Sequence, residues 1–137
     1  MPAVFRTMRS DGGRPLVGST GRSLGVRPIK DIPVDGKGNV RPDTGGMSVA
    51  SSWRDLSPWR IPERLVAIAP NACGSNLDSC WRLGTGAFVA AELPPHHLYF
   101  RPDTLTHGTV EPALRMSLEE YQRNLAATRD EWEIDES

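Results

Sequence analysis

The apolar residues of this chain occur in short runs interrupted by glycine, proline and turn-forming residues, and only one segment has helical periodicity. Leu24 to Ile32 alternates apolar and polar residues around Pro28, which limits that segment to an irregular or edge strand. A turn is expected at 35–38, where Asp-Gly-Lys-Gly stands. Short strands are expected at 4–6, 48–49, 65–68, 87–90, 98–100 and 108–112. Many short strands with one helix predict an α+β fold rather than alternating βαβ units.

The helical segment lies near the C-terminus. Ser117 and Glu120 form a Ser-x-x-Glu capping box, which is typical of a helix start. Apolar residues then recur at helical spacing and predict a long helix that packs on the sheet as scaffold. The residues of this face are Leu118, Tyr121, Leu125, Thr128 and Trp132.

The chain's 137 residues are enough for one domain over 1–137 with a sizeable core. A formal net charge of −1 argues against nucleic-acid binding by bulk electrostatics. The cations are fourteen Arg and two Lys, and the planar guanidinium suits phosphate and carboxylate groups, although GC-rich coding gives the same bias. The N-terminal thirty residues are basic and the C-terminal nineteen acidic, so either an anionic ligand or a basic partner fits this pattern.

Cys73 and Cys80 are the two cysteines, and free thiols of a cytoplasmic protein are expected, with a small-loop disulfide as the alternative. No apolar run approaches eighteen residues, and the N-terminus has no apolar core of a signal peptide. The sequence thus predicts no membrane span, and export would need a route without a cleaved leader.

The stretch Pro42–Val49 concentrates groups that bind a polar or anionic ligand. Gly45 and Gly46 let the backbone approach a partner closely, and Thr44 and Ser48 supply hydroxyls beside them. The alternative is a plain turn between two strands.

A second polar group lies at His107, Thr109 and Glu111, which share one face if 107–111 is a regular strand. His107 could donate to a ligand or transfer a proton, or it could be a turn histidine bonded to its own neighbours. Arg6, on the first expected strand, must be paired or bind an anion, because a lone buried charge is costly. A pyrophosphate would satisfy it, as would a neighbouring Asp.

Other sites have no support. Neither a Gly-x-x-x-x-Gly-Lys phosphate loop nor a Gly-x-Gly-x-x-Gly fingerprint is present. His96-His97 lacks a cysteine or carboxylate at ligand spacing, so no metal site is expected.

The order of these motifs resembles a known family. Pro42-Asp43-Thr44-Gly45-Gly46-x-Ser48-Val49 is followed by Phe88-Val89, Pro94-Pro95 and Leu98. Thr106-His107-x-Thr109-Val110-x-Pro112-Ala113-x-x-Met116 comes next, and the last helix ends in Trp132. This pattern is similar to the small ADP-ribosyltransferase-like cytotoxins exported by the bacterial type VI secretion system. The resemblance covers roughly residue 39 to the end, and Val4-Phe5-Arg6 is similar to the aromatic-arginine pair that opens many such domains.

The resemblance implies two facing antiparallel sheets around a cleft that holds NAD as substrate, with no metal. Arg6 would contact the NAD phosphates or ribose, and Thr44, Ser48 and His107 would line the reactive end. Glu111 is the nearest candidate for the family's glutamate, although no Glu-x-Glu or Gln-x-Glu pair is present. The expected catalytic residues are Ser48, His107, Thr44 and Glu111, and the expected NAD contacts are Arg6, Gly45, Gly46 and Thr109.

The implied activity is transfer of ADP-ribose to a macromolecular target by a toxin or effector. An NAD glycohydrolase would use the same cleft with water as acceptor, and a non-enzymatic binding module could retain the fold. The implied partners are a cognate immunity protein and an unidentified target, with nucleic acid as a less favoured target and no membrane. The implied location is the producer's cytoplasm, followed by export into a target cell.

Overall fold

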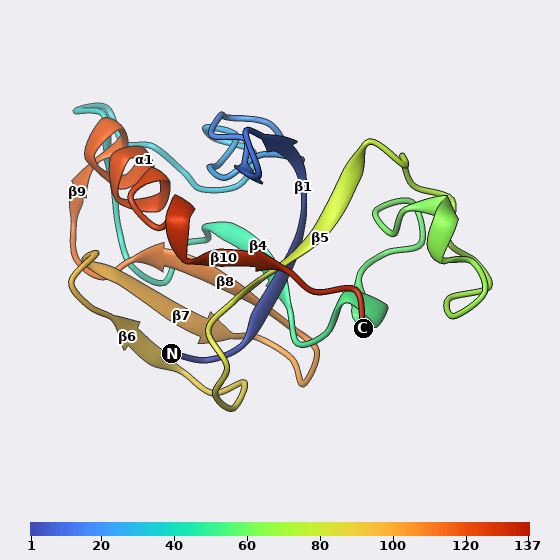
Figure 1. The fold of residues 1–137 in the computed structure, drawn as a ribbon. Helices are drawn as coiled ribbons and strands as arrows, with labels where there is room; N and C mark the ends of the chain where they lie inside the picture. Colours follow the sequence, from blue (N-terminus) through green and yellow to red (C-terminus); the bar gives the residue numbers. More distant parts are fainter.

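The computed structural model describes residues 1–137 as a mixed fold, mostly strands in a curled antiparallel sheet with one short helix (Figure 1). Its main sheet has eight strands in the order β10-β5-β1-β4-β8-β7-β6, with β2 paired to β1, and β3 pairs with β9 separately. The strands are β1 Val4–Asp11, β2 Arg14–Pro15, β3 Asn39–Val40, β4 Met47–Ala50, β5 Asp78–Leu83, β6 Ala91–Leu93, β7 Leu98–Pro102, β8 His107–Pro112, β9 Met116–Ser117 and β10 Trp132–Ile134. The helix is α1 Leu118–Ala126, and the 3₁₀ turns are Trp53–Asp55, Glu63–Leu65 and Arg129–Glu131.

Strand β1 lies between β5 and β4 and joins two groups of strands. It pairs with β5 over six positions, from Val4–Leu83 to Arg9–Asp78. Its pairing with β4 is confined to one position, Phe5 opposite Ala50. The strand ladder therefore joins β4-β8-β7-β6 to β10-β5-β1 at a single residue pair, where the sheet curls.

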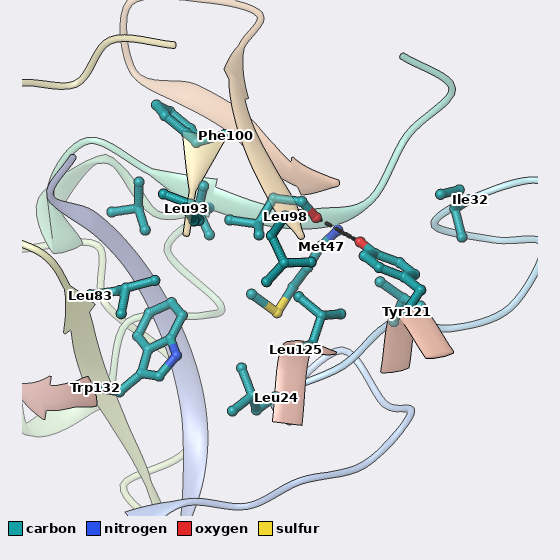
Figure 2. Packing of buried hydrophobic residues seen from close by; sticks show 14 of the residues in the cluster. Leu24, Ile32, Met47, Leu83, Leu93, Leu98, Phe100, Tyr121, Leu125 and Trp132 are labelled. Carbon is teal, nitrogen blue, oxygen red and sulfur yellow. Dashed lines mark hydrogen bonds between the residues drawn. The ribbon is translucent and has the colours of Figure 1, made fainter. Parts of the chain in front are cut away.

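Alternation along β1 divides the core into two clusters. Val4 and Met8 belong to a cluster of eighteen buried residues that also includes side chains of α1, as Figure 2 shows for Tyr121 and Leu125. Phe5 belongs to a smaller cluster with Trp53, Ile61, Ala72 and Cys80. The segment 51–77 packs through this second cluster and lies at the opposite end of the molecule from α1 in Figure 1.

Helix α1 begins as predicted but is shorter than expected. The Ser117 hydroxyl accepts a hydrogen bond from the Glu120 amide at 3.1 Å, and Tyr121 and Leu125 are fully buried. The helix ends at Ala126, where the Thr128 hydroxyl donates to the Leu125 carbonyl at 2.7 Å. Trp132 is buried from strand β10, opposite Leu83, rather than from a helix face.

Most of the other predicted elements are present. Strands at 4–6, 48–49, 98–100 and 108–112 and the turn at 35–38 are confirmed, and 24–32 has only isolated bridges. The predicted strands at 65–68 and 87–90 are wrong: 65–68 is the end of a 3₁₀ helix followed by a turn, and 87–90 is a bend without strand pairing. Val66, Ile68 and Val89 there are about half exposed, so these apolar residues do not belong to the core. Strand β5 was not predicted, since its polar residues mask its alternation.

No helix of the structure is long and apolar enough to cross a membrane.

Candidate functional site

A cleft of about 230 Å³ opens where β1 and β4 part. Its floor comes from β1, β4 and β8, and its walls come from the segments 21–31 and 55–60. The lining residues are Arg6, Thr7, Gly21, Arg27, Asp31, Ser48, Val49, Ala50, Asp55, Leu56, Ser57, Trp59, Arg60 and His107. Three predicted site residues from distant parts of the sequence, Arg6, Ser48 and His107, therefore meet in one cleft.

Arg6 occupies the gap between β1 and β4 and has no carboxylate partner. Its Nε donates to the main-chain carbonyl of Ser23 at 3.1 Å. Its Nη1 donates to the main-chain carbonyl of Ser48 at 2.9 Å, and its Nη2 donates to that of Gly25 at 3.4 Å. Burial, with the nearby cation of Arg60, lowers the pKa of Arg6 to about 10. A guanidinium has five N–H donors, so Arg6 keeps donors for a ligand and makes the cleft floor positive.

Ser48 and His107 lie on the same face of neighbouring strands. Ser48 stands opposite Thr109 and Ala50 stands opposite His107, so alternation places both polar side chains on one side of the sheet. The Nδ1 atom of His107 is 2.8 Å from a carboxylate oxygen of Asp103. The Ser48 hydroxyl and the His107 Nε2 atom have no hydrogen-bond partner in the protein and are available to a ligand in the cleft.

Three arginines and two aspartates line the cleft: Arg6, Arg27 and Arg60, with Asp31 and Asp55. Arg27 holds Asp31 through its Nε and Nη2 at 3.2 and 2.9 Å. Burial opposes ionisation of Asp31, but the bonds from Arg27 outweigh it, so the pKa of Asp31 is below its ordinary value. Arg60 has no carboxylate within ion-pair distance and bonds to the Gly21 carbonyl. Burial and the charges of Arg27 and Arg22 lower the pKa of Arg60.

Two further residues give the cleft an aromatic wall and a carboxylate. Trp59 is 61 % exposed, whereas Trp53, Trp81 and Trp132 are at most 1 % exposed. Asp55 makes no ion pair and accepts a hydrogen bond from the Ser51 hydroxyl at 2.8 Å. The cleft thus combines unpaired guanidiniums, an exposed indole and a free carboxylate.

The remaining predicted residues do not line the cleft. Glu111 is 1 % exposed and accepts hydrogen bonds at 3.0 Å from both the Asp43 amide and Arg101 Nε. The Thr109 hydroxyl is 3.4 Å from Glu111, and the Thr44 hydroxyl donates to the Arg41 carbonyl at 2.8 Å. These groups bond to each other or to the backbone and hold the 41–46 loop against β8.

Gly45 and Gly46 also face protein rather than the cleft. A Cβ on Gly45 would lie 2.5 Å from the Asp31 carbonyl, and one on Gly46 would lie 2.6 Å from the Val110 carbonyl and 3.0 Å from the Tyr121 hydroxyl. Figure 2 shows Tyr121 reaching this point, where its hydroxyl accepts from the Met47 amide and donates to the Val110 carbonyl. The two glycines therefore admit α1 and the 31–32 turn close to β4.

Sequence reasoning did not find the wall residues Arg27, Asp55, Trp59 and Arg60. The excess of arginine over lysine pointed to anion recognition in general, but it did not separate these arginines from the others. Their proximity depends on the fold of 51–60, a segment in which the sequence predicts no helix or strand. The Thr7 hydroxyl fixes that segment to β1 by donating to the Arg60 carbonyl at 2.8 Å.

Comparison with known proteins gave no match: no family model fits the chain, and no curated protein or solved structure is significantly similar to it.

Proposed function

We propose that this protein binds NAD in the cleft and transfers ADP-ribose to a cellular target, as an ADP-ribosyltransferase-like effector. The observation that carries the proposal is the meeting of Arg6, Ser48 and His107 in a cleft where the guanidiniums of Arg6 and Arg60 have no carboxylate partner. The three residues come from three separate stretches of sequence, on β1, β4 and β8, and their convergence supports the proposal.

Each group has a role that suits NAD. The guanidiniums of Arg6 and Arg60 balance the pyrophosphate charge, since arginine donors match phosphate oxygens. The Ser48 hydroxyl and His107 Nε2 bond to the ribose or carboxamide at the reactive end. Transfer breaks the glycosidic bond, whose electron pair leaves with nicotinamide, and the acceptor loses its proton as the new bond forms. His107 takes that proton.

The carboxylate assigned to the reaction is Asp55 rather than Glu111. Positive charge develops on the ribose as nicotinamide leaves, and a fixed negative group stabilises it. Glu111 is sealed by Arg101 and the Asp43 amide, whereas Asp55 lines the cleft without an ion pair. The same sealing of Glu111 favours a second candidate, a non-enzymatic NAD-binding module.

The finer fold assignment is part of the same proposal. An ADP-ribosyltransferase domain has two facing sheets, and here β10-β5-β1 and β4-β8-β7-β6 are joined through the single pair Phe5–Ala50. We assign these groups to the two facing sheets, with the NAD cleft at the point where they part.

Thermal unfolding with and without NAD tests the binding. A ligand at a hundred times its dissociation constant adds about 2.7 kcal/mol of stability, so the melting temperature should rise. The Ser48→Ala/His107→Ala variant should lose this rise, and the matched Ser19→Ala/His96→Ala variant, outside the cleft, should keep it. No shift with millimolar NAD would exclude both the enzyme and the binding module.

Labelled NAD then separates the activities. Label on protein or another macromolecule supports transfer, and free ADP-ribose alone supports an NAD glycohydrolase. Binding without either product supports the binding module.

Growth tests address the proposed toxicity. Expression inside a bacterium should arrest growth, and the Ser48→Ala/His107→Ala variant should not. Co-expression with a cognate immunity protein, the partner that the proposal requires, should restore growth. Normal growth with the intact chain would contradict the toxin assignment.

A further inference from the structure

Beside the main cleft lies a second hollow, of about 330 Å³, that shares a wall with it. It is lined by Thr20, Gly21, Arg22, Arg27, Trp59 and Arg60. No carboxylate lines this hollow, although three of its six lining residues are arginines. Ser48 and His107 do not reach it, so its chemistry differs from that of the reactive end.

Two guanidiniums converge here over Gly21. A Cβ on Gly21 would lie 3.1 Å from Nη2 of Arg60 and 3.6 Å from Cζ of Arg27. The absent side chain is what allows both cations to approach the same point of the backbone. Like charges repel at this range, and burial together with the charge of Arg27 lowers the pKa of Arg60.

Of these two arginines, Arg27 is paired with a carboxylate and Arg60 is not. Asp31 is held by Arg27, and Asp78 is shared by Arg9 and Arg22 at 2.9 and 2.7 Å. Arg60 has no acidic partner within 4.0 Å. A bound anion would relieve the excess charge, and a phosphate offers oxygens to both guanidiniums.

Trp59 adds a second, independent indication of the ligand. It is 61 % exposed and is the only one of the chain's four tryptophans that solvent reaches to any extent. An exposed indole beside an anion site provides a stacking surface for a base.

We propose that this hollow binds a nucleotide, with its phosphate between Arg27 and Arg60 and its base stacked on Trp59. The proposal deepens the proposed function and rests on it for the ligand's identity, because the nucleotide is either the adenylate half of NAD or a separate acceptor nucleotide. The shared chemistry is a phosphate next to a purine.

Tryptophan fluorescence with AMP as the probe tests the site directly. Because the other tryptophans are buried, stacking of adenine on Trp59 should quench the exposed component and protect it from iodide. Adenosine and ribose 5-phosphate should bind more weakly than AMP, since each lacks half of the recognised group. Absence of quenching by millimolar AMP, or equal binding of ribose 5-phosphate, would overturn the proposal.

Matched variants locate the site. Arg60→Gln should weaken AMP binding about tenfold or more, as expected for loss of a charge-assisted bond. Arg123→Gln removes the same charge from an exposed position on α1 and should leave the affinity unchanged. Trp59→Phe, at an exposed position where folding is not at risk, should lose the quenching. Dialysis with labelled AMP should show at most a modest change in the AMP affinity of Trp59→Phe, whereas Trp59→Ala should weaken AMP binding about fivefold or more.

Competition with NAD distinguishes the two sources and the two proposals. Displacement of AMP by NAD assigns the hollow to the adenylate half, and simultaneous binding assigns it to an acceptor nucleotide. AMP binding that depends on Arg60, with no effect of Ser48→Ala/His107→Ala on NAD, would keep the hollow and reject the proposed function. NAD turnover with AMP binding unaffected by Arg60→Gln and Trp59→Ala would keep the proposed function and reject the hollow as the nucleotide site.

Discussion

Nη1 of Arg6 donates to the main-chain carbonyl of Ser48 at 2.9 Å, across 42 residues of sequence. The bond lies where the β1–β4 ladder stops after Phe5 and Ala50. The guanidinium replaces the missing strand pairing with a side-chain bond and also places positive charge beside the Ser48 hydroxyl. One residue thus closes the sheet and forms the floor of the cleft.

Replacing Arg6 with lysine should destabilise the protein although the charge is kept. A compact ammonium cannot donate at once to the carbonyls of Ser23, Gly25 and Ser48, which the planar guanidinium reaches in different directions. A buried carbonyl left without a donor costs about 1–3 kcal/mol, and a urea titration should show a lower midpoint with little change in slope. The control is Arg123→Lys, on the surface of α1. Equal stability of Arg6→Lys and the wild type would mean that the three bonds contribute little.

Gly46→Ala should be among the more damaging small substitutions. The new methyl group would lie 2.6 Å from the Val110 carbonyl and 3.0 Å from the Tyr121 hydroxyl, which forces α1 away from β4. Overpacking of this kind costs about 1–3 kcal/mol. Gly36→Ala is the matched control, because nothing lies within 4 Å of its Cβ position, and it should change stability by less than about 0.5 kcal/mol. A Gly46→Ala protein with an unchanged melting temperature would contradict this account of the glycine.

The predictable parts of the fold are those in which local pattern and tertiary role agree. The capping box at Ser117 could be predicted because the bond from the Glu120 amide is local. Strand β8 could be predicted from its apolar alternation. Trp132 misled the helix prediction because it has the right spacing for α1. The bond from the Thr128 hydroxyl to the Leu125 carbonyl ends the helical turn before Trp132, and pairing of β10 with β5 buries the Trp132 indole. That pairing is a long-range contact, which periodicity does not encode.

For the site, the sequence identified residue types better than roles. Arg6, Ser48 and His107 line the cleft. They could be predicted because strand alternation and a cation on a buried strand are local signals. Glu111 was as good a candidate by spacing, yet Arg101 on the neighbouring strand neutralises it at 3.0 Å. Trp59 and Arg60 were missed because their position depends on the fold of the segment 51–60, which has neither helical nor strand periodicity.

Gly21→Ala should reduce nucleotide affinity with little loss of stability. The added Cβ would lie 3.1 and 3.2 Å from the two terminal nitrogens of Arg60, so this guanidinium must move away from that of Arg27. We expect AMP affinity to fall about threefold or more as one charge-assisted bond is lengthened, with a melting temperature near that of Gly36→Ala. Unchanged AMP binding would show that the convergence over Gly21 does not serve the ligand.

Alkaline pH should destabilise the protein through Cys80. Burial, with the nearby charge of Glu136, raises the pKa of this thiol from 9.0 to about 12. Between these values the unfolded chain has lost the proton that the folded chain keeps, so the folded state binds more protons and stability falls as pH rises. One such group contributes a slope of about −1.4 kcal/mol per pH unit.

Urea unfolding from pH 8 upward should show this slope begin near the lower pKa. The slope should be shallower in Cys80→Ala than in the control Cys73→Ala, which removes an exposed thiol. Burial also raises the pKa of Tyr121, and its ordinary pKa is higher than that of a thiol, so the first pH unit above 9 separates the two residues. Parallel curves for Cys80→Ala and Cys73→Ala would mean that the Cys80 thiol ionises equally in both states. A shallower curve for Cys73→Ala alone would place the effect at the other cysteine.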